Sequence, residues 1–212
     1  MFTRILSALV VITSLSACVS MPPAHDYTAF KAVNPESVII LPPVNNTPEV
    51  IAPYSVMTQL ATPIAESGFY VFPVALVNQT FNNNGLTQAA DIQAISSQKL
   101  KEIFGADTAL YVTIDDYGTS YVVISSETRV SVTASLVDLA SGQTLWTGAA
   151  TASSAEQQNG NSGGLVGMLV QAAVTQIFET VTDRGFDIAA LTSARLLSAE
   201  SYNGLLYGPR SP

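Results

Sequence analysis

One cysteine occurs in the 212-residue chain, and its neighbours suit it to covalent lipid attachment. Leu15-Ser16-Ala17-Cys18 ends an apolar run that begins at Ile5, and Arg4 places a positive charge ahead of that run. The run is too short to span a bilayer, and the small residues before the cysteine leave room for a peptidase. The stretch fits the bacterial lipobox and predicts cleavage after residue 17, with acyl chains on Cys18. An ordinary cleaved signal, with Cys18 left as a spare thiol, is the alternative.

Lipid on Cys18 would anchor the mature chain in a membrane, because two or three acyl chains bind a bilayer far more stably than one. With its only cysteine used, the chain has no candidate for a disulfide, a cysteine metal ligand or a cysteine nucleophile. The residues after the cysteine direct sorting in bacterial lipoproteins, and Val19-Ser20 lacks the Asp associated with inner-membrane retention. We therefore expect an outer-membrane lipoprotein that faces the periplasm.

Few other residues could carry acid–base chemistry. His25 is the only histidine and lies near the anchor, so nucleophilic catalysis has no histidine base in the expected domain. Asp115 and Asp116 are neighbours on a predicted strand, so they should point to opposite faces and share no substrate or metal. The other aspartates lack calcium-loop or metal-ligand spacing: Asp107, Asp138, Asp183 and Asp187. We expect no enzyme, no cofactor and no metal; an enzyme that uses only carboxylates, such as Asp107 or Asp115, is the alternative.

The composition describes a neutral polar surface. Acidic residues number 16 and basic residues 8, and charged residues make up only 11% of the chain. Without a basic stripe, nucleic acid and anionic lipid head groups are not expected partners. We divide the chain into a signal peptide (1–17), a lipidated tether (18–36) and one domain (37–212), a size that suits a single core.

The expected elements position these residues in one α+β domain. Residues 129–136 alternate apolar and polar side chains, as in an antiparallel strand with one wet face. Helices end at Gly68 and Gly105, and Pro63 should kink or split the first of them. The predicted strands are 38–41, 69–77, 109–117 (broken by Gly118), 121–124, 129–136 and 143–151; the predicted helices are 52–66, 87–95, 97–104, 165–181 and 191–199. This order, β-α-β-α-α-β-β-β-β-α, predicts a mixed sheet with parallel early strands, antiparallel late strands and packed helices.

Two segments leave alternatives open. The Gly-rich stretch 160–167 either connects elements flexibly or presents backbone amides to an anion. The apolar helix expected after it lies either in the core or, through Gly163 and Gly167, against a partner protein or a second copy. At the carboxy terminus, the tail either frays or docks on the domain or a partner through Tyr207 and Arg210, two residue types that favour interfaces.

Seven sequence blocks carry a resemblance that covers nearly the whole mature chain. They are Pro53-Tyr54-Ser55-Val56, Gly68-Phe69-Tyr70-Val71-Phe72-Pro73-Val74, Phe81-Asn82-Asn83-Asn84-Gly85-Leu86, Ile103-Phe104-Gly105-Ala106-Asp107, Asp116-Tyr117-Gly118-Thr119, Ser153-Ser154-Ala155-Glu156-Gln157-Gln158 and Tyr207-Gly208-Pro209-Arg210-Ser211-Pro212. With these blocks the chain resembles a bacterial lipoprotein family named domain of unknown function 799. The resemblance implies a fold similar to the TolB amino-terminal domain, and more loosely to CsgG-type lipoproteins and LpoB. It implies no active site.

The resemblance also implies a partner, because members of this family are often encoded beside a CsgG-like lipoprotein. We expect a non-enzymatic interaction component of an envelope assembly or secretion system, with a CsgG-like partner or as a homo-oligomer. The alternative is a lipoprotein that binds a small ligand or peptidoglycan in a cleft. Such a cleft would be lined by tyrosines, with Tyr54, Tyr70, Tyr111 and Tyr117 as the candidates.

Substitution Cys18→Ala should release the protein from membranes, because no other residue of the chain can carry the lipid. Membrane fractionation and metabolic labelling with a clickable palmitate analogue measure this directly. The wild-type chain should label and sediment with membranes, whereas the variant should do neither. Labelling of the Cys18→Ala variant would contradict the assignment.

Overall fold

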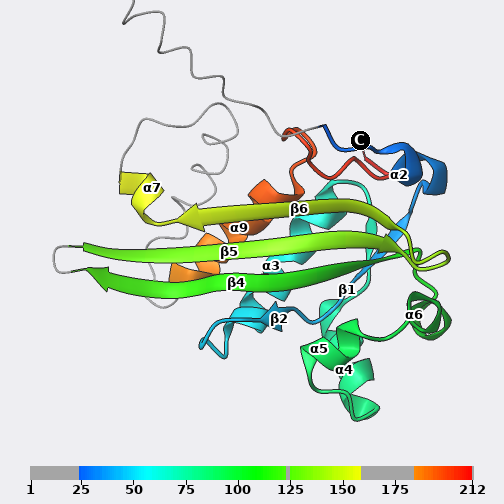
Figure 1. Cartoon of the computed structure of the whole chain (residues 1–212), viewed down its shortest axis with the longest axis horizontal. Coiled ribbons are helices and arrows are strands. Elements are labelled where there is room, and N and C mark those ends of the chain that lie inside the picture. The colour runs from blue at the N-terminus through cyan, green and yellow to red at the C-terminus, as the bar shows by residue number, and fades with distance from the viewer. Residues whose placement is uncertain (1–23, 123–124, 159–183, 212) are drawn as a thin grey trace, which may run out of the picture.

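The computed structural model describes residues 24–122, 125–158 and 184–211, which Figure 1 shows in colour. Cys18, Gly163, Gly167 and the helix expected over 165–181 lie outside the described residues. Among the described helices, none has the length and apolar character needed to cross a membrane.

A mixed sheet of six strands forms the centre of the domain. Its strands are β1 (Ser37–Ile40), β2 (Val44–Asn45), β3 (Tyr70–Val71), β4 (Thr108–Val122), β5 (Ser125–Asp138) and β6 (Thr144–Ser153). The order is β3-β1-β4-β5-β6, and β2 pairs with β4 farther along the edge that β1 occupies. β1 is parallel to β3 and β4, while β4, β5 and β6 are antiparallel neighbours. The predicted α+β class, with parallel early strands and antiparallel late ones, is confirmed.

Helices cover one face of the long strands. The described helices are α2 (Thr28–Val33), α3 (Ala52–Glu66), α4 (Val74–Asn83), α5 (Ala89–Gln93), α6 (Ser97–Phe104), α7 (Ala155–Gln158) and α9 (Arg184–Leu197). In Figure 1, α3 and α9 lie together behind β4, β5 and β6, and α4 to α6 lie beside the β1 and β2 edge. Within the described residues, no helix covers the front face of β4, β5 and β6.

The alternation along β5 decides which face is buried. Val130, Val132 and Leu136 are buried under α3 and α9, whereas Arg129 and Thr133 point to solvent. β1 has no such alternation, because Val38, Ile39 and Ile40 are all fully buried. This matches the behaviour of a short strand enclosed on both faces.

The strand predicted over 69–77 is wrong in its second half. Only Tyr70 and Val71 pair in the sheet, and α4 begins at Val74 directly after Pro73. Val77 and Phe81, four residues apart, form the buried side of this helix. Helical spacing therefore prevailed over the β propensity of the valines and phenylalanines.

β4 runs unbroken through Gly118, which corrects the predicted break there. Gly118 has φ of 135° and stays in the ladder opposite Arg129, so 109–117 and 121–122 belong to a single strand. The first helix is likewise continuous through Pro63 and has the predicted bounds, 52–66. The last helix begins at Arg184 rather than at 191. The turn at Ser141-Gly142 is confirmed.

The described part of the expected tether packs against the domain. The Phe30 side chain of α2 is buried and meets the Phe69 ring edge-on, with centroids 6.4 Å apart. The backbone N–H of His25 donates to Asn203 Oδ1 at 2.7 Å, and the Tyr27 hydroxyl donates to the Gly204 carbonyl at 2.5 Å. The part of the expected tether from His25 onward is therefore bonded to the domain.

One carboxylate joins the start of β1 to the start of β4. Asp107 Oδ2 accepts the Ser37 hydroxyl at 2.9 Å and the N–H groups of Ser37 and Glu36 at 3.2 Å each. Asp107 Oδ1 accepts from Lys101 Nζ at 3.1 Å. Partial burial raises the pKa of Asp107, but the hydrogen bonds from Ser37, Lys101 and Glu36 outweigh it and hold the pKa below its usual value.

Substitution Asp107→Asn should lower the free energy of unfolding by about 1 kcal/mol at pH 7, a modest amount because the carboxylate is partly exposed. Because the folded pKa is depressed, this stability is present above the unfolded pKa of about 3.9 and is lost as pH falls through the folded pKa. Urea denaturation from pH 7 to pH 3 should show the difference from wild type closing at low pH. Glu102→Gln, in an exposed pair with Lys99, is the control. A difference that does not change with pH would contradict this account.

Candidate functional site

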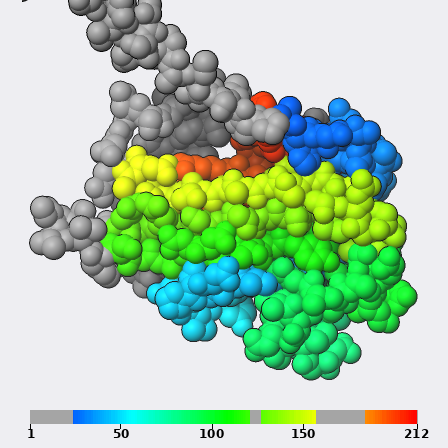
Figure 2. Space-filling view, viewed as in Figure 1, coloured from blue at the N-terminus to red at the C-terminus, as the bar shows by residue number. Residues whose placement is uncertain are grey.

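The open face of the long strands carries small hydroxyl side chains in register. Tyr111, Ser135 and Thr147 lie side by side across β4, β5 and β6. Two positions along, Thr113, Thr133 and Ala149 form a second row. Figure 2 shows these strands at the molecular surface, in green to yellow. The rows form a polar grid fixed by the backbone ladder rather than by mobile loops.

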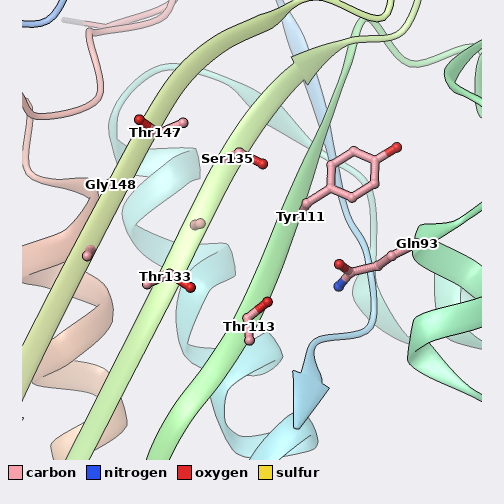
Figure 3. Close-up of a pocket in the computed structure, with 9 residues that line it drawn as sticks. Gln93, Tyr111, Thr113, Thr133, Ser135, Thr147 and Gly148 are labelled. Carbon is pink, nitrogen blue, oxygen red and sulfur yellow. The ribbon is translucent and has the colours of Figure 1, made fainter. Parts of the chain in front are cut away.

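A groove of about 710 Å³ lies over this grid. Strands β4, β5 and β6 form its floor, and Gln93 from α5 stands beside β4 at one side (Figure 3). None of the residues that line it carries a charge. Its polar groups are those of Gln93, Tyr111, Thr113, Thr133, Ser135 and Thr147.

Gln93 is held in one orientation. Its Nε2 donates to the Pro42 carbonyl and to the Val112 carbonyl, both at 2.9 Å. Because both amide hydrogens are used, Oε1 is the atom of this side chain that remains to accept a hydrogen bond. Gln93 is thus a fixed acceptor on the wall of the groove, and no local sequence pattern indicates this role.

Only one of the four candidate cleft tyrosines lines the groove. Tyr111 does so, half-buried, and burial raises the pKa of its phenol, which remains neutral at physiological pH. Tyr54 and Tyr70 are exposed elsewhere. Tyr117 is buried, and its hydroxyl donates to Ser55 Oγ at 2.9 Å. Of the four candidates, Tyr111 is therefore the one that the structure places at this groove.

The candidate acidic residues do not converge. A bulge between Ile114 and Asp116 interrupts the alternation of β4, and Asp115 and Asp116 are both exposed, so the expected opposite orientation does not hold. Asp138 caps the β5–β6 turn by accepting the N–H and hydroxyl of Ser141. Among residues 24–122, 125–158 and 184–211, no group of three or more His, Cys, Asp or Glu residues is arranged to hold a metal ion.

The carboxy-terminal tail docks on the domain through its backbone. The N–H of Gly208 donates to the Ser67 carbonyl at 2.8 Å, and the N–H of Arg210 donates to the Gly68 carbonyl at 3.1 Å. The Arg210 guanidinium lies 3.7 Å from the Glu36 carboxylate, whereas the Tyr207 ring remains 53% exposed. Of the two alternatives for the tail, docking on the domain is the one observed.

Three apolar side chains stand exposed where α3 begins. Val50 is 82% exposed, Tyr54 61% and Ile51 51%. Val50 and Ile51 lie in the turn that precedes α3, and Tyr54 lies in the first turn of the helix. We call Val50, Ile51 and Tyr54 the α3 entry patch. Sequence analysis did not single it out, although Val50-Ile51 ahead of a helix start was a usable signal.

These features define a class: a mixed α+β domain with one sheet face open, in a chain that carries a lipobox. The family model described as "Putative lipoprotein GNA1162-like" matches residues 25–210, and the chain belongs to this family. A relative, "Putative lipoprotein NMB1124/NMB1162" of Neisseria meningitidis serogroup B, is 46% identical over 203 residues. The alignment covers 95% of this chain and 94% of that relative.

A solved structure agrees with this assignment. The crystal structure of lipoprotein GNA1162 from Neisseria meningitidis is 44% identical and has a TM-score of 0.56. It covers 69% of this chain and all of its own. A PelC dodecamer from Paraburkholderia phytofirmans is a weaker match, with 15% identity, a TM-score of 0.48, and coverage of 89% of this chain and 96% of its own.

Substitution Gly68→Ala should loosen the docked tail. Gly68 has φ of 90°, and an added Cβ would lie 2.2 Å from the backbone nitrogen of Ser211. Gly85→Ala is the matched control, because Gly85 has φ of 78° and open space around the added atom. Both variants should lose about 1–2 kcal/mol of stability from the left-handed backbone.

The readout that separates these two variants is trypsin cleavage after Arg210, followed by mass spectrometry. Only Gly68→Ala should be cut faster there than wild type. Equal cleavage of the two variants would mean that the tail is not held at Gly68.

Proposed function

We propose that this protein is a non-enzymatic interaction component of an envelope assembly or secretion system, anchored in the outer membrane and facing the periplasm. The lipobox at Cys18 and membership of a lipoprotein family support the anchor. The absence of Asp after Cys18 supports the outer membrane. The α3 entry patch supports the interaction and is the observation on which the proposal depends.

The patch has the properties of a contact surface. The buried side of α3 faces the core through Val56, Leu60 and Ile64, so the exposed residues at its start contribute little to that packing. Three large apolar side chains within five residues of the chain are exposed there, and exposed apolar patches mark protein contacts. Tyr54 adds an aromatic ring with a polar tip, a residue type enriched at interfaces.

A CsgG-like lipoprotein is the partner we propose, on the strength of the family resemblance carried by the sequence blocks. Two proteins anchored in one membrane meet at a raised effective concentration, so a modest apolar patch suffices for a specific contact. A second copy of this chain is the rival occupant, and the experiment distinguishes the two.

Photo-crosslinking in cells tests this proposal. A photoreactive phenylalanine analogue replaces Tyr54 in one strain and Leu76 in another, in the natively lipidated protein. The two positions are matched in exposure, at 61% and 59%, but Leu76 lies on α4. The analogue at position 54 should give a discrete crosslinked product that mass spectrometry identifies as a CsgG-like lipoprotein, and position 76 should not.

The double substitution Val50→Ser and Ile51→Ser should abolish that product while changing the free energy of unfolding by only about 0.5 kcal/mol, as expected at exposed sites. If mass spectrometry identified only this chain in the crosslinked product, the partner would be a second copy and the protein a homo-oligomer. Crosslinking of equal strength at positions 54 and 76, or at neither, would overturn the role of the patch.

A further inference from the structure

We propose that the groove over β4, β5 and β6 binds an uncharged saccharide. This site is distinct from the α3 entry patch and goes beyond the interaction role proposed above. Its elements are the fixed amide of Gln93, the ring of Tyr111 and the hydroxyls of Thr113, Thr133, Ser135 and Thr147.

The lining determines the charge of the ligand. No Lys, Arg, Asp or Glu side chain is among the groove residues. A charged ligand would lose its hydration in the groove without gaining an opposite charge as a partner. A neutral ligand would not incur this desolvation cost. Charged residues of these strands, among them Asp116, Glu127 and Arg129, lie farther along the hairpin, beyond the two groove rows.

The hydroxyls of the groove are available for a ligand. Farther along the same strands, Ser131 and Thr151 bond to each other at 2.8 Å, and Thr119 bonds to Thr128 at 2.9 Å. Within the described part of the chain, the hydroxyls of Thr113, Thr133, Ser135 and Thr147 have no such partner. A hydroxyl can donate and accept at once, so a row of them matches a ligand that is itself rich in hydroxyls.

Gln93 and Tyr111 determine which groups the groove offers at one of its sides. The Gln93 amide is oriented before any ligand arrives, since two backbone carbonyls hold its Nε2, so presenting Oε1 costs no side-chain entropy. The Tyr111 ring stands beside it (Figure 3) and offers an apolar face with a hydroxyl at its edge. Sugar rings carry the complementary pair of surfaces, C–H groups on a face and hydroxyls at the rim.

The grid also favours an extended ligand. Adjacent strands are about 4.8 Å apart and alternate residues of a strand about 6.8 Å apart, so the two rows offer hydroxyls at regular intervals in both directions. The volume of about 710 Å³ lies within the usual range for ligand sites, about 300–1,000 Å³. The groove is open rather than enclosed, which suits a segment of a longer glycan.

Isothermal titration calorimetry with the natively lipidated protein, in a detergent without sugar head groups and at physiological salt, tests the inference. The probes are the hexamers of N-acetylglucosamine and of glucose, both uncharged, and the cationic de-N-acetylated form of the first. At least one uncharged probe should bind saturably and more tightly than the cationic one. Binding of none of the three, or tighter binding of the cationic form, would overturn the inference.

Two matched variants locate the binding. Thr133→Val removes one hydroxyl of the groove and keeps the β-branched shape, so affinity should fall about three- to tenfold, the effect of one lost hydrogen bond. Thr151→Val makes the same change at an exposed position of β6 outside the groove and should bind like wild type. Tyr111→Ala should weaken binding further. A measured affinity that is unchanged in Thr133→Val and in Tyr111→Ala would place the ligand elsewhere and overturn the assignment.

Discussion

The fold depends on covering one face of three long antiparallel strands. Side chains along β5 alternate, so Val130, Val132 and Leu136 must all leave water together or not at all. Burial of each such side chain contributes about 1.5–3 kcal/mol, and α3 and α9 supply the cover. The requirement for small side chains is strict where the cover is closest: a Cβ on Gly185 of α9 would lie 2.6 Å from the Tyr117 hydroxyl. Among the described residues no helix covers the other face, and both the hydroxyl grid and the groove lie there.

The two ends of the described chain complete the core together. Trp146 is fully buried, and its indole N–H donates to the Asn203 carbonyl at 2.9 Å, so a residue of β6 is satisfied only when the carboxy-terminal segment is in place. His25 and Tyr27 bond to the same segment, at Asn203 and Gly204. The segment that leads to the anchor and the tail are therefore parts of one packing unit.

The sequence predicted those elements whose side-chain period was unambiguous. The bounds of α3 and the facing of β5 followed from spacing alone, and the mixed sheet followed from the order of elements. The failures have physical causes. Pro73 and the β-branched residues around it predicted a strand where α4 forms. The pairing of Gly118 with Arg129 keeps β4 continuous where the glycine predicted a break. The bulge at Asp115 adds a residue that no alternation pattern contains. The groove depends on Gln93 meeting Pro42 and Val112, a contact between distant segments that local patterns do not encode.

The chain is bonded to the domain from His25 onward, and this limits the distance between the domain and its lipid anchor. A hydrogen bond to Asn203 already holds His25, and only five residues lie between Cys18 and Ala24. With lipid on Cys18, as proposed, a fully extended chain from Cys18 to Ala24 spans at most about 20 Å, so the domain would stay within a short distance of the bilayer. The domain could rotate about this short connection but could not move far from the bilayer surface. Any glycan or protein it meets must then come to that thin layer, and its encounters take place in two dimensions rather than three.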